Sequence, residues 1–269
     1  MTSTTSTPSP YRWQRFTTAQ RLVRFVAYLG TVAVLVWAVR DLDIYWPWVW
    51  DAPVQIRDLF VRMSPPKLTG LVPIGQALIE TVHIATLATV LSLLLALPTA
   101  YLAAQNTTPH PALLWLARLI VVSTRSVNTI IWALLFVAIF GPGVVAGILA
   151  IAFRSIGFVG KLMAEAIEEI DKRQVEAIEA TGAGRGKVVL YGIVPQVLPA
   201  FFAVAILRWD INIRESTVLG LVGAGGIGLI LQGAIDLFDW QTVATVLIAI
   251  LGVVVLGEFV SAALRRRVL

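Results

Sequence analysis

Three glycines in residues 221–228, LVGAGGIG, have the Gly-x-Gly-x-x-Gly spacing of a turn that binds a dinucleotide phosphate. Such a turn needs a buried strand before it, a helix after it and an acidic residue about twenty positions further on. The preceding residues, RWDINIRESTVLGLV, follow an apolar stretch and carry several charges, unlike a buried strand. Asp236 and Asp239 lie too close to Gly228 to bind a ribose. The surroundings therefore argue against a nucleotide site.

The same glycines have a second use in a membrane, where small residues let helices approach closely. We interpret residues 220–233 as a close-packed bend that is re-entrant or forms a short helix toward the external side. Glycines used only for packing and glycines used as part of a gate both fit this pattern.

A phosphate-binding loop is the chemistry to test in ATGAGRGK, residues 180–187. The pattern G-x4-G-K-[ST] requires glycine five residues before Gly186 and Ser or Thr after Lys187. The sequence has Thr181 and Val188 there, so the loop fails at both positions.

Enzyme and metal chemistry find little support in the remaining residues. The chain has no Cys, and its two His, His83 and His110, have no second ligand at metal-site spacing. No nucleophile elbow, HExxH pattern or carboxylate pair on one helix face is present. We predict no catalytic residue, no metal and no cofactor bound by this chain.

Ionisable residues inside apolar stretches face a cavity, a partner or an interface. Asp210 and Arg214 are spaced for a helical ion pair. A guanidinium fork matches phosphate or phosphonate oxygens, so Arg125, with Asn128 after it, or Arg154 is a candidate to line an anion path. The alternative is that these arginines serve helix packing or extend to the membrane interface. We predict no role for the others: Glu80, His83, Arg208, Glu258.

The composition places these residues in a membrane. Of 269 residues, 58% are hydrophobic and 14% charged, and the mean hydropathy is +0.82. Soluble domains have about 45–50% apolar and about 25% charged residues.

A membrane-crossing helix needs about 20 apolar residues. We predict five to seven spans, with six as the best count: 22–39, 77–103, 121–140, 144–163, 194–213, 241–262. Residues 141–143, GPG, fit a tight turn, and residues 112–122 are expected to lie along the interface.

Basic residues predict the orientation, because cytoplasmic segments are enriched in Lys and Arg. With both termini cytoplasmic, the inner segments contain Arg12, Arg15, Arg21, Arg24, Lys172, Arg173, Arg185, Lys187, Arg265, Arg266 and Arg267. The outer segments then contain fewer: Arg40, Arg57, Arg62, Lys67 and Arg214. The first span is expected to be a retained anchor. The aromatic, proline-broken segment 41–68 is expected on the outer surface, as an interfacial anchor or a docking site.

The longest inner connection, residues 164–193, is helical in pattern in its first half and glycine-rich in its second. Ile167, Ile170, Val175 and Ile178 recur near helical spacing, and Gly182, Gly184 and Gly186 are expected to break the helix. The segment is either a solvated linker or a short helix that fits a groove on a partner.

Within this connection, EAIEATGAGRGKVVLYGIVPQVLP resembles the EAA loop of membrane subunits of binding-protein-dependent ABC importers. Glu176-Ala177-Ile178 and Gly182 match its first part, and Val194-Pro195 occupies the Leu-Pro positions. Ile178 replaces the usual third Ala, and Gly192 stands where the family usually has Ile. The resemblance implies a loop that docks on a separate ATPase, with these residues: Glu176, Ala177, Ile178, Ala180, Gly182, Ala183, Gly184.

Two further phrases, FRSIGFVGKLMAEAIEEID and RESTVLGLVGAGGIG, resemble the phosphonate importer permease, and the likeness covers residues 74–262. It implies an all-α, type I, methionine-importer-like permease fold in a prokaryotic plasma membrane. Its partners would be a second copy of the chain, two cytosolic ATPases that bind ATP and Mg, and an external binding protein. Residues expected at the path or gate are Arg125, Asn128, Arg154, Arg214, Glu215, Ser216, Gly223, Gly225 and Gly226.

The expected organisation has four parts: a disordered cytoplasmic N-terminus at 1–20, a first span with the aromatic segment at 21–73, a permease core at 74–262 and a basic cytoplasmic tail at 263–269. The expected cargo is phosphonate, phosphate or phosphite. The alternatives are an importer for methionine or another small solute, and a membrane scaffold or enzyme that works without an ATPase.

Overall fold

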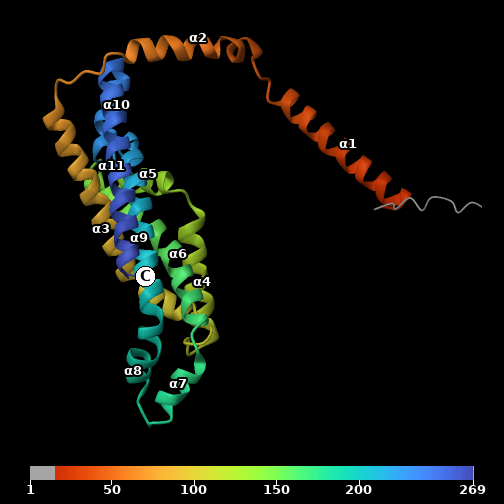
Figure 1. The fold of residues 1–269 in the computed structure, drawn as a ribbon, viewed down its shortest axis with the longest axis vertical. Coiled ribbons are helices and arrows are strands. Elements are labelled where there is room, and N and C mark those ends of the chain that lie inside the picture. Colours follow the sequence, from red (N-terminus) through yellow and green to blue (C-terminus); the bar gives the residue numbers. More distant parts are fainter. Residues whose placement is uncertain (1–15, 269) are drawn as a thin grey trace, which may run out of the picture. The chain divides into compact units, whose positions relative to one another are not determined.

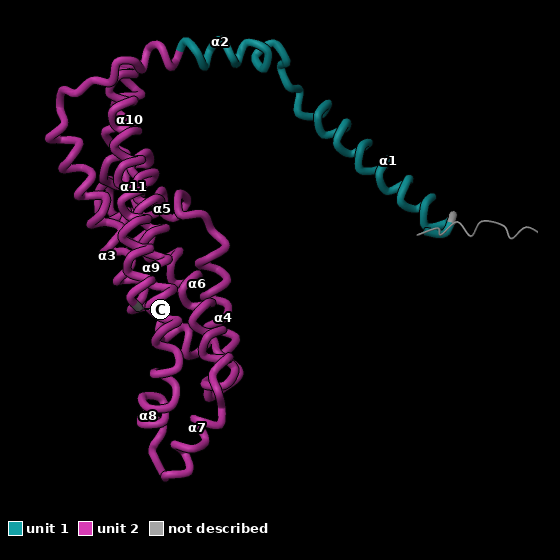
Figure 2. Tube along the Cα trace, viewed as in Figure 1, with its two compact units in different colours: residues 1–58 teal, residues 59–269 magenta. Residues whose placement is uncertain are grey.

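The computed structural model describes residues 16–268, and all regular structure in that range is helical. Two compact units, residues 1–58 and 59–269, are shown in Figure 2 and are described separately. Most of the terminus that we expected to be disordered, together with Arg12 and Arg15, lies outside the described residues.

The first described helix confirms the first predicted span. Helix α1 (Thr18–Asp41) begins after Thr17, whose side chain accepts from the Gln20 N–H in a capping box. The disordered segment expected at 1–20 was therefore wrong at its last three residues, which are helical. The apolar side chains of α1 are exposed along its whole length, as on a helix surrounded by lipid.

The aromatic segment is helical where we expected prolines to break it. Helix α2 (Trp46–Met63) continues through Pro53 and carries four of the segment's aromatic side chains: Trp46, Trp48, Trp50 and Phe60. A proline removes one backbone hydrogen bond but does not always end a helix.

The second unit is a bundle of long helices with short helices at both ends (Figure 1). Its long helices are α3 (Leu71–Ala103), α6 (Val144–Glu168), α9 (Val194–Leu219) and α11 (Trp240–Val268). The shorter ones are α4 (Pro111–Ser126), α5 (Thr129–Phe140), α7 (Lys172–Glu179), α8 (Arg185–Val188), the π-helical turn η1 (Val189–Ile193), the 3-10 turn η2 (Gly220–Val222) and α10 (Ile227–Asp236). Helices α3, α6 and α9 pack on one another, and α11 packs on α9.

Five described helices are long and apolar enough to cross a membrane, or six if a bent pair counts as one span. This agrees with the predicted number. The last span continues through residues 263–268, so the tail that we expected to follow it is the end of α11.

The predicted span 121–140 was wrong as a single helix. Its residues belong to α4 and α5, which meet at 93°. Val127 is extended, and the Asn128 side chain accepts from the Ile130 N–H to begin α5. Residues 112–122 are part of α4, which packs on α3 and α6.

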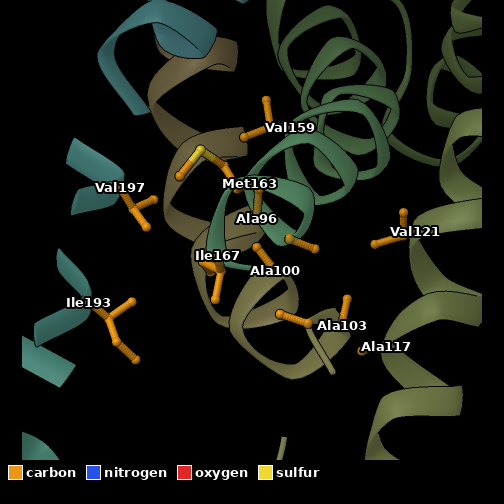
Figure 3. Close-up of a cluster of buried hydrophobic side chains, with 12 residues drawn as sticks. Ala96, Ala100, Ala103, Ala117, Val121, Val159, Met163, Ile167, Ile193 and Val197 are labelled. Atoms are coloured by element: carbon orange, nitrogen blue, oxygen red, sulfur yellow. The ribbon is translucent and has the colours of Figure 1, made fainter. Parts of the chain in front are cut away.

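Alanines let the central helices approach closely. One buried cluster joins four helices (Figure 3): Ala96, Ala100, Ala103 and Ala104 near the end of α3; Ala117 and Val121 of α4; Val159, Met163, Ala164 and Ile167 of α6; Ile193 and Val197 at the start of α9. Small side chains at such contacts are typical of membrane helix packing.

The segment before α3 is fixed to the start of α11. The Lys67 N–H donates to the Gln241 carbonyl at 3.3 Å, and Thr245 Oγ1 donates to the Lys67 carbonyl at 2.8 Å. Lys67 Nζ pairs with Asp239 Oδ2 at 3.0 Å. Hydrogen bonds from Thr242 and then from Lys67 lower the pKa of Asp239, which stays ionised and holds this connection.

Candidate functional site

One candidate site lies where α5 begins, against the middle of α6 and the second half of α9. Glu215 of α9 pairs with Arg154 of α6 through its Oε1 atom. Its other oxygen, Oε2, accepts from Arg208 Nη2 at 3.2 Å and from Thr129 Oγ1 at 2.8 Å. This carboxylate of α9 therefore connects to α6 through Arg154 and to α5 through Thr129, whereas Arg208 pairs with it from within α9.

A second layer of polar side chains supports Arg208. Its Nε donates to Ser155 Oγ at 2.8 Å, and Ser155 Oγ lies 3.3 Å from Asn212 Oδ1. Asn212 Nδ2 donates to Thr89 Oγ1 of α3 at 2.8 Å. Ser155 and Asn212 are fully buried, so this chain of hydrogen bonds fixes the Arg208 side chain in one place.

The two arginines differ in exposure. The Arg208 side chain is 2% exposed, Glu215 17% and Arg154 33%. Arg208 is thus enclosed by protein, whereas Arg154 reaches the surface of the single chain. Two guanidinium groups share one carboxylate, so Arg154, Arg208 and Glu215 together have a net charge of +1.

The structure brings only part of the expected path residues into this cluster. Arg154 and Glu215 are in it, and Asn128 caps the helix whose first residue contacts Glu215. Arg214 pairs with Asp210, as the spacing predicted. Arg125 is exposed at the end of α4, and Asn128 does not follow it on a common helix as we had assumed.

The glycine-rich turn forms a close-packed bend followed by the short helix α10, as predicted. Gly223, Gly225 and Gly226 all have positive φ angles, which glycine adopts without strain. Glu80 Oε1 of α3 accepts from the Gly226 N–H at 3.0 Å. Thr81 Oγ1 accepts from the Ile227 N–H at 2.9 Å, and Ser216 Oγ lies 3.2 Å from the Thr81 carbonyl. Helix α3 therefore caps the start of α10.

We expect Glu80→Leu to destabilise the protein, because the Gly226 N–H loses its acceptor. Leaving such a donor unsatisfied costs about 1–3 kcal/mol of folding free energy. For a chain of this size that corresponds to a fall in Tm of roughly 2–9 °C in detergent. Glu80→Gln keeps an oxygen acceptor and should lose less. His83→Leu, at an exposed position on the same helix, is the control. An unchanged Tm for Glu80→Leu would contradict this cap.

The second candidate site is the outer face of α7. Asp171 caps this helix, and the Glu169–Asp171 break separates it from α6, so the helical pattern expected in the first half of the connection is divided between two helices. Glu176, Ala177 and Ala180 are exposed. The two alanines add little side-chain bulk to this exposed face.

The inner face of α7 packs on the turn before α9. A Cβ atom at Gly192 would lie 3.4 Å from Ile178 Cδ1 and 3.5 Å from Val175 Cα. The departure from the family pattern at Gly192 thus lies against Val175 and Ile178 of α7. Gln196 Oε1 accepts from the Asp171 N–H at 2.9 Å, which ties the start of α7 to α9.

The glycines after α7 do not all break the helix. Gly182 has a φ of +78° and lies in the turn after α7, and Gly184 precedes α8 as its N-cap. Gly186 lies within α8, so our prediction for it was wrong. Ala183 is half-buried between them.

Several residues of the first site were not among our predicted path residues: Thr89, Thr129, Arg208 and Asn212. A signal was available for one of them, because Arg208 and Glu215 are two helical turns apart on one face of α9. Glu80 was noticed, but its partner Gly226 could not be found from spacing.

Comparison with known proteins gives three findings. The family model described as "Binding-protein-dependent transport system inner membrane component" matches residues 96–269. The phosphite transport system permease protein PtxC of Stutzerimonas stutzeri is 38% identical over 92% of this chain and 89% of its own length. The phosphate-import permease protein PhnE of Mycolicibacterium smegmatis is 41% identical over 80% of this chain and 41% of its own length.

The fold also matches a solved structure. A chain of the MetNI methionine ABC transporter, in inward-facing conformations, superposes with a TM-score of 0.66 over 76% of this chain and 99% of its own length. The sequence identity is 23%, so this likeness concerns the fold.

Proposed function

Because this chain belongs to the family of binding-protein-dependent transport system inner membrane components, we propose that it is the membrane-spanning subunit of an ABC importer for a phosphorus oxyanion: phosphonate, phosphite or phosphate. The cargo assignment rests on one observation: the chain is about 40% identical to permeases named for phosphite and phosphate transport. The positively charged cluster around Glu215 is compatible with an anionic cargo.

The chain would work with partners. Two copies would form the path as a C2 dimer, the commonest closed symmetry. Two cytosolic ATPases would bind ATP and Mg and dock on α7, and an external binding protein would deliver the cargo. This chain itself would bind no cofactor. The basic end of α11, with Arg265, Arg266 and Arg267, supports cytoplasmic termini.

The proposed coupling runs from α7 to α9. Closure of the ATPase pair on ATP would move α7, and the Gln196–Asp171 hydrogen bond would transmit that movement to α9. Helix α9 carries Arg208 and Glu215 and leads into the glycine-rich turn. The bundle would then shift its population from inward-open to outward-open.

The test is ATP-dependent uptake by proteoliposomes that contain this chain with its neighbouring ATPase and the binding protein supplied outside. Phosphate, phosphite, an alkylphosphonate and methionine are each offered. We expect accumulation of at least one phosphorus oxyanion and copurification of the ATPase with the chain. Accumulation of methionine alone would overturn the cargo, and no uptake without a bound ATPase would overturn the importer.

A further inference from the structure

Arg154 lies deep in a membrane-crossing helix. It is ten residues from the start of α6 at Val144 and fourteen from its end at Glu168, or roughly 15 and 21 Å along the helix axis. A charged side chain at this depth faces protein or water and avoids lipid. Because a third of the Arg154 side chain is exposed in the single chain, this surface must face a water-filled path or the second subunit.

Glu215 takes the position of an anion in this cluster. Its two oxygens receive hydrogen bonds from Arg154, Arg208 and Thr129. Two guanidinium groups and a hydroxyl are a donor set that suits the oxygens of phosphate, phosphite or a phosphonate. A structural ion pair would need one arginine, and Arg208 with its buried supports already fills that role.

Arg154 has donor capacity beyond its bond to Glu215. Its Nε atom is buried and has no hydrogen-bond partner among the described residues. A buried donor without a partner is uncommon and costly in a folded protein. Because this atom is covered by protein, an arriving oxyanion would reach it only once Glu215 has moved away from Arg154.

We propose that Arg154 is a transient binding site for the phosphorus oxyanion, in which Glu215 acts as an internal anion until the cargo replaces it on Arg154. Arg208 retains Glu215 during the exchange, so the buried charge is never left without a partner. The cargo meets the excess positive charge and leaves when Glu215 returns. This inference rests on the proposed function.

The test measures binding of inorganic phosphate and phosphite to the detergent-solubilised complex of the full chain with its ATPase, without the binding protein. In Arg154→Gln, Arg208 and Glu215 remain as an ion pair with no net charge. We expect this variant to bind phosphate and phosphite at least about tenfold more weakly, the factor for one charge-assisted hydrogen bond. Arg154→Lys should recover part of the affinity. Glu215→Gln removes the competing charge and should tighten binding about tenfold.

Lys161→Gln is the matched control, because it removes the same charge from an exposed position on the same helix, where Lys161 pairs with Glu165. It should bind phosphate like the original chain. If Glu215→Gln leaves Arg208 uncompensated and does not fold, Arg154→Gln decides the question by itself.

Uptake separates this inference from the proposed function. If the original chain imports phosphite and Arg154→Gln binds and imports it equally well, the site is overturned and the importer stands. If Arg154→Gln separates the complex and Arg154→Lys restores it without binding phosphate, Arg154 is an assembly residue and the site is overturned. Import of methionine alone would overturn the cargo itself.

Discussion

Replacing Gly182 by Asp should reduce the rate of ATP-dependent uptake at least about hundredfold, which corresponds to about 2.7 kcal/mol. The chain should still insert into the membrane. Gly182 has a φ of +78°, and its N–H donates to the Glu179 carbonyl at 2.9 Å. Nothing lies within 4 Å of a Cβ atom built there. Asp tolerates this left-handed conformation better than most residues, so the turn can persist. The new side chain would instead occupy the surface on which the ATPase is proposed to dock.

The uptake rate, the ATP hydrolysis rate and the amount of copurified ATPase are measured together. Gly182→Asn adds similar bulk without charge and separates a steric effect from an electrostatic one. Gly186→Ala is the matched control, because Gly186 lies within α8 with nothing within 4 Å of the added methyl group. Normal uptake by Gly182→Asp would contradict the proposal that the ATPase docks on this surface.

Replacing Gly220 by Ala should destabilise the fold by about 3 kcal/mol or more, the upper end of the cost of overpacking. A Cβ atom at Gly220 would lie 2.5 Å from Gly228 Cα and 2.6 Å from Leu229 N. Both neighbours are backbone atoms, so no side chain can turn away to make space. The two glycines let the end of α9 and the start of α10 touch, and a methyl group there forces the helices apart.

Gly233→Ala is the matched control for this prediction. Gly233 lies within α10, and nothing lies within 4 Å of its added methyl group. Alanine is the better helix former there by about 0.5–1 kcal/mol, so Gly233→Ala should leave Tm unchanged or raise it. The yield of monodisperse protein and its Tm in detergent are the measurements. Equal yield and Tm for Gly220→Ala and Gly233→Ala would contradict the close contact.

The sequence by itself determined that this chain is a helical membrane protein and where most of its spans lie. Transfer of a segment into a bilayer depends on its length and composition, both of which can be read along the chain. The segment that we propose to dock on the ATPase was also proposed from sequence, because Glu176 and Gly182 belong to one short stretch with a characteristic spacing. The fingerprint at Gly223 was rejected from its immediate surroundings.

The tertiary structure decided what hydropathy does not report. The apolar window 121–140 has the same composition whether or not Asn128 starts a new helix, so the 93° bend could not be predicted from it. Arg154 and Glu215 are 61 residues apart and meet because α6 and α9 pack with those faces together. Helix rotation and packing depend on side-chain shapes across the whole bundle, which no single segment contains.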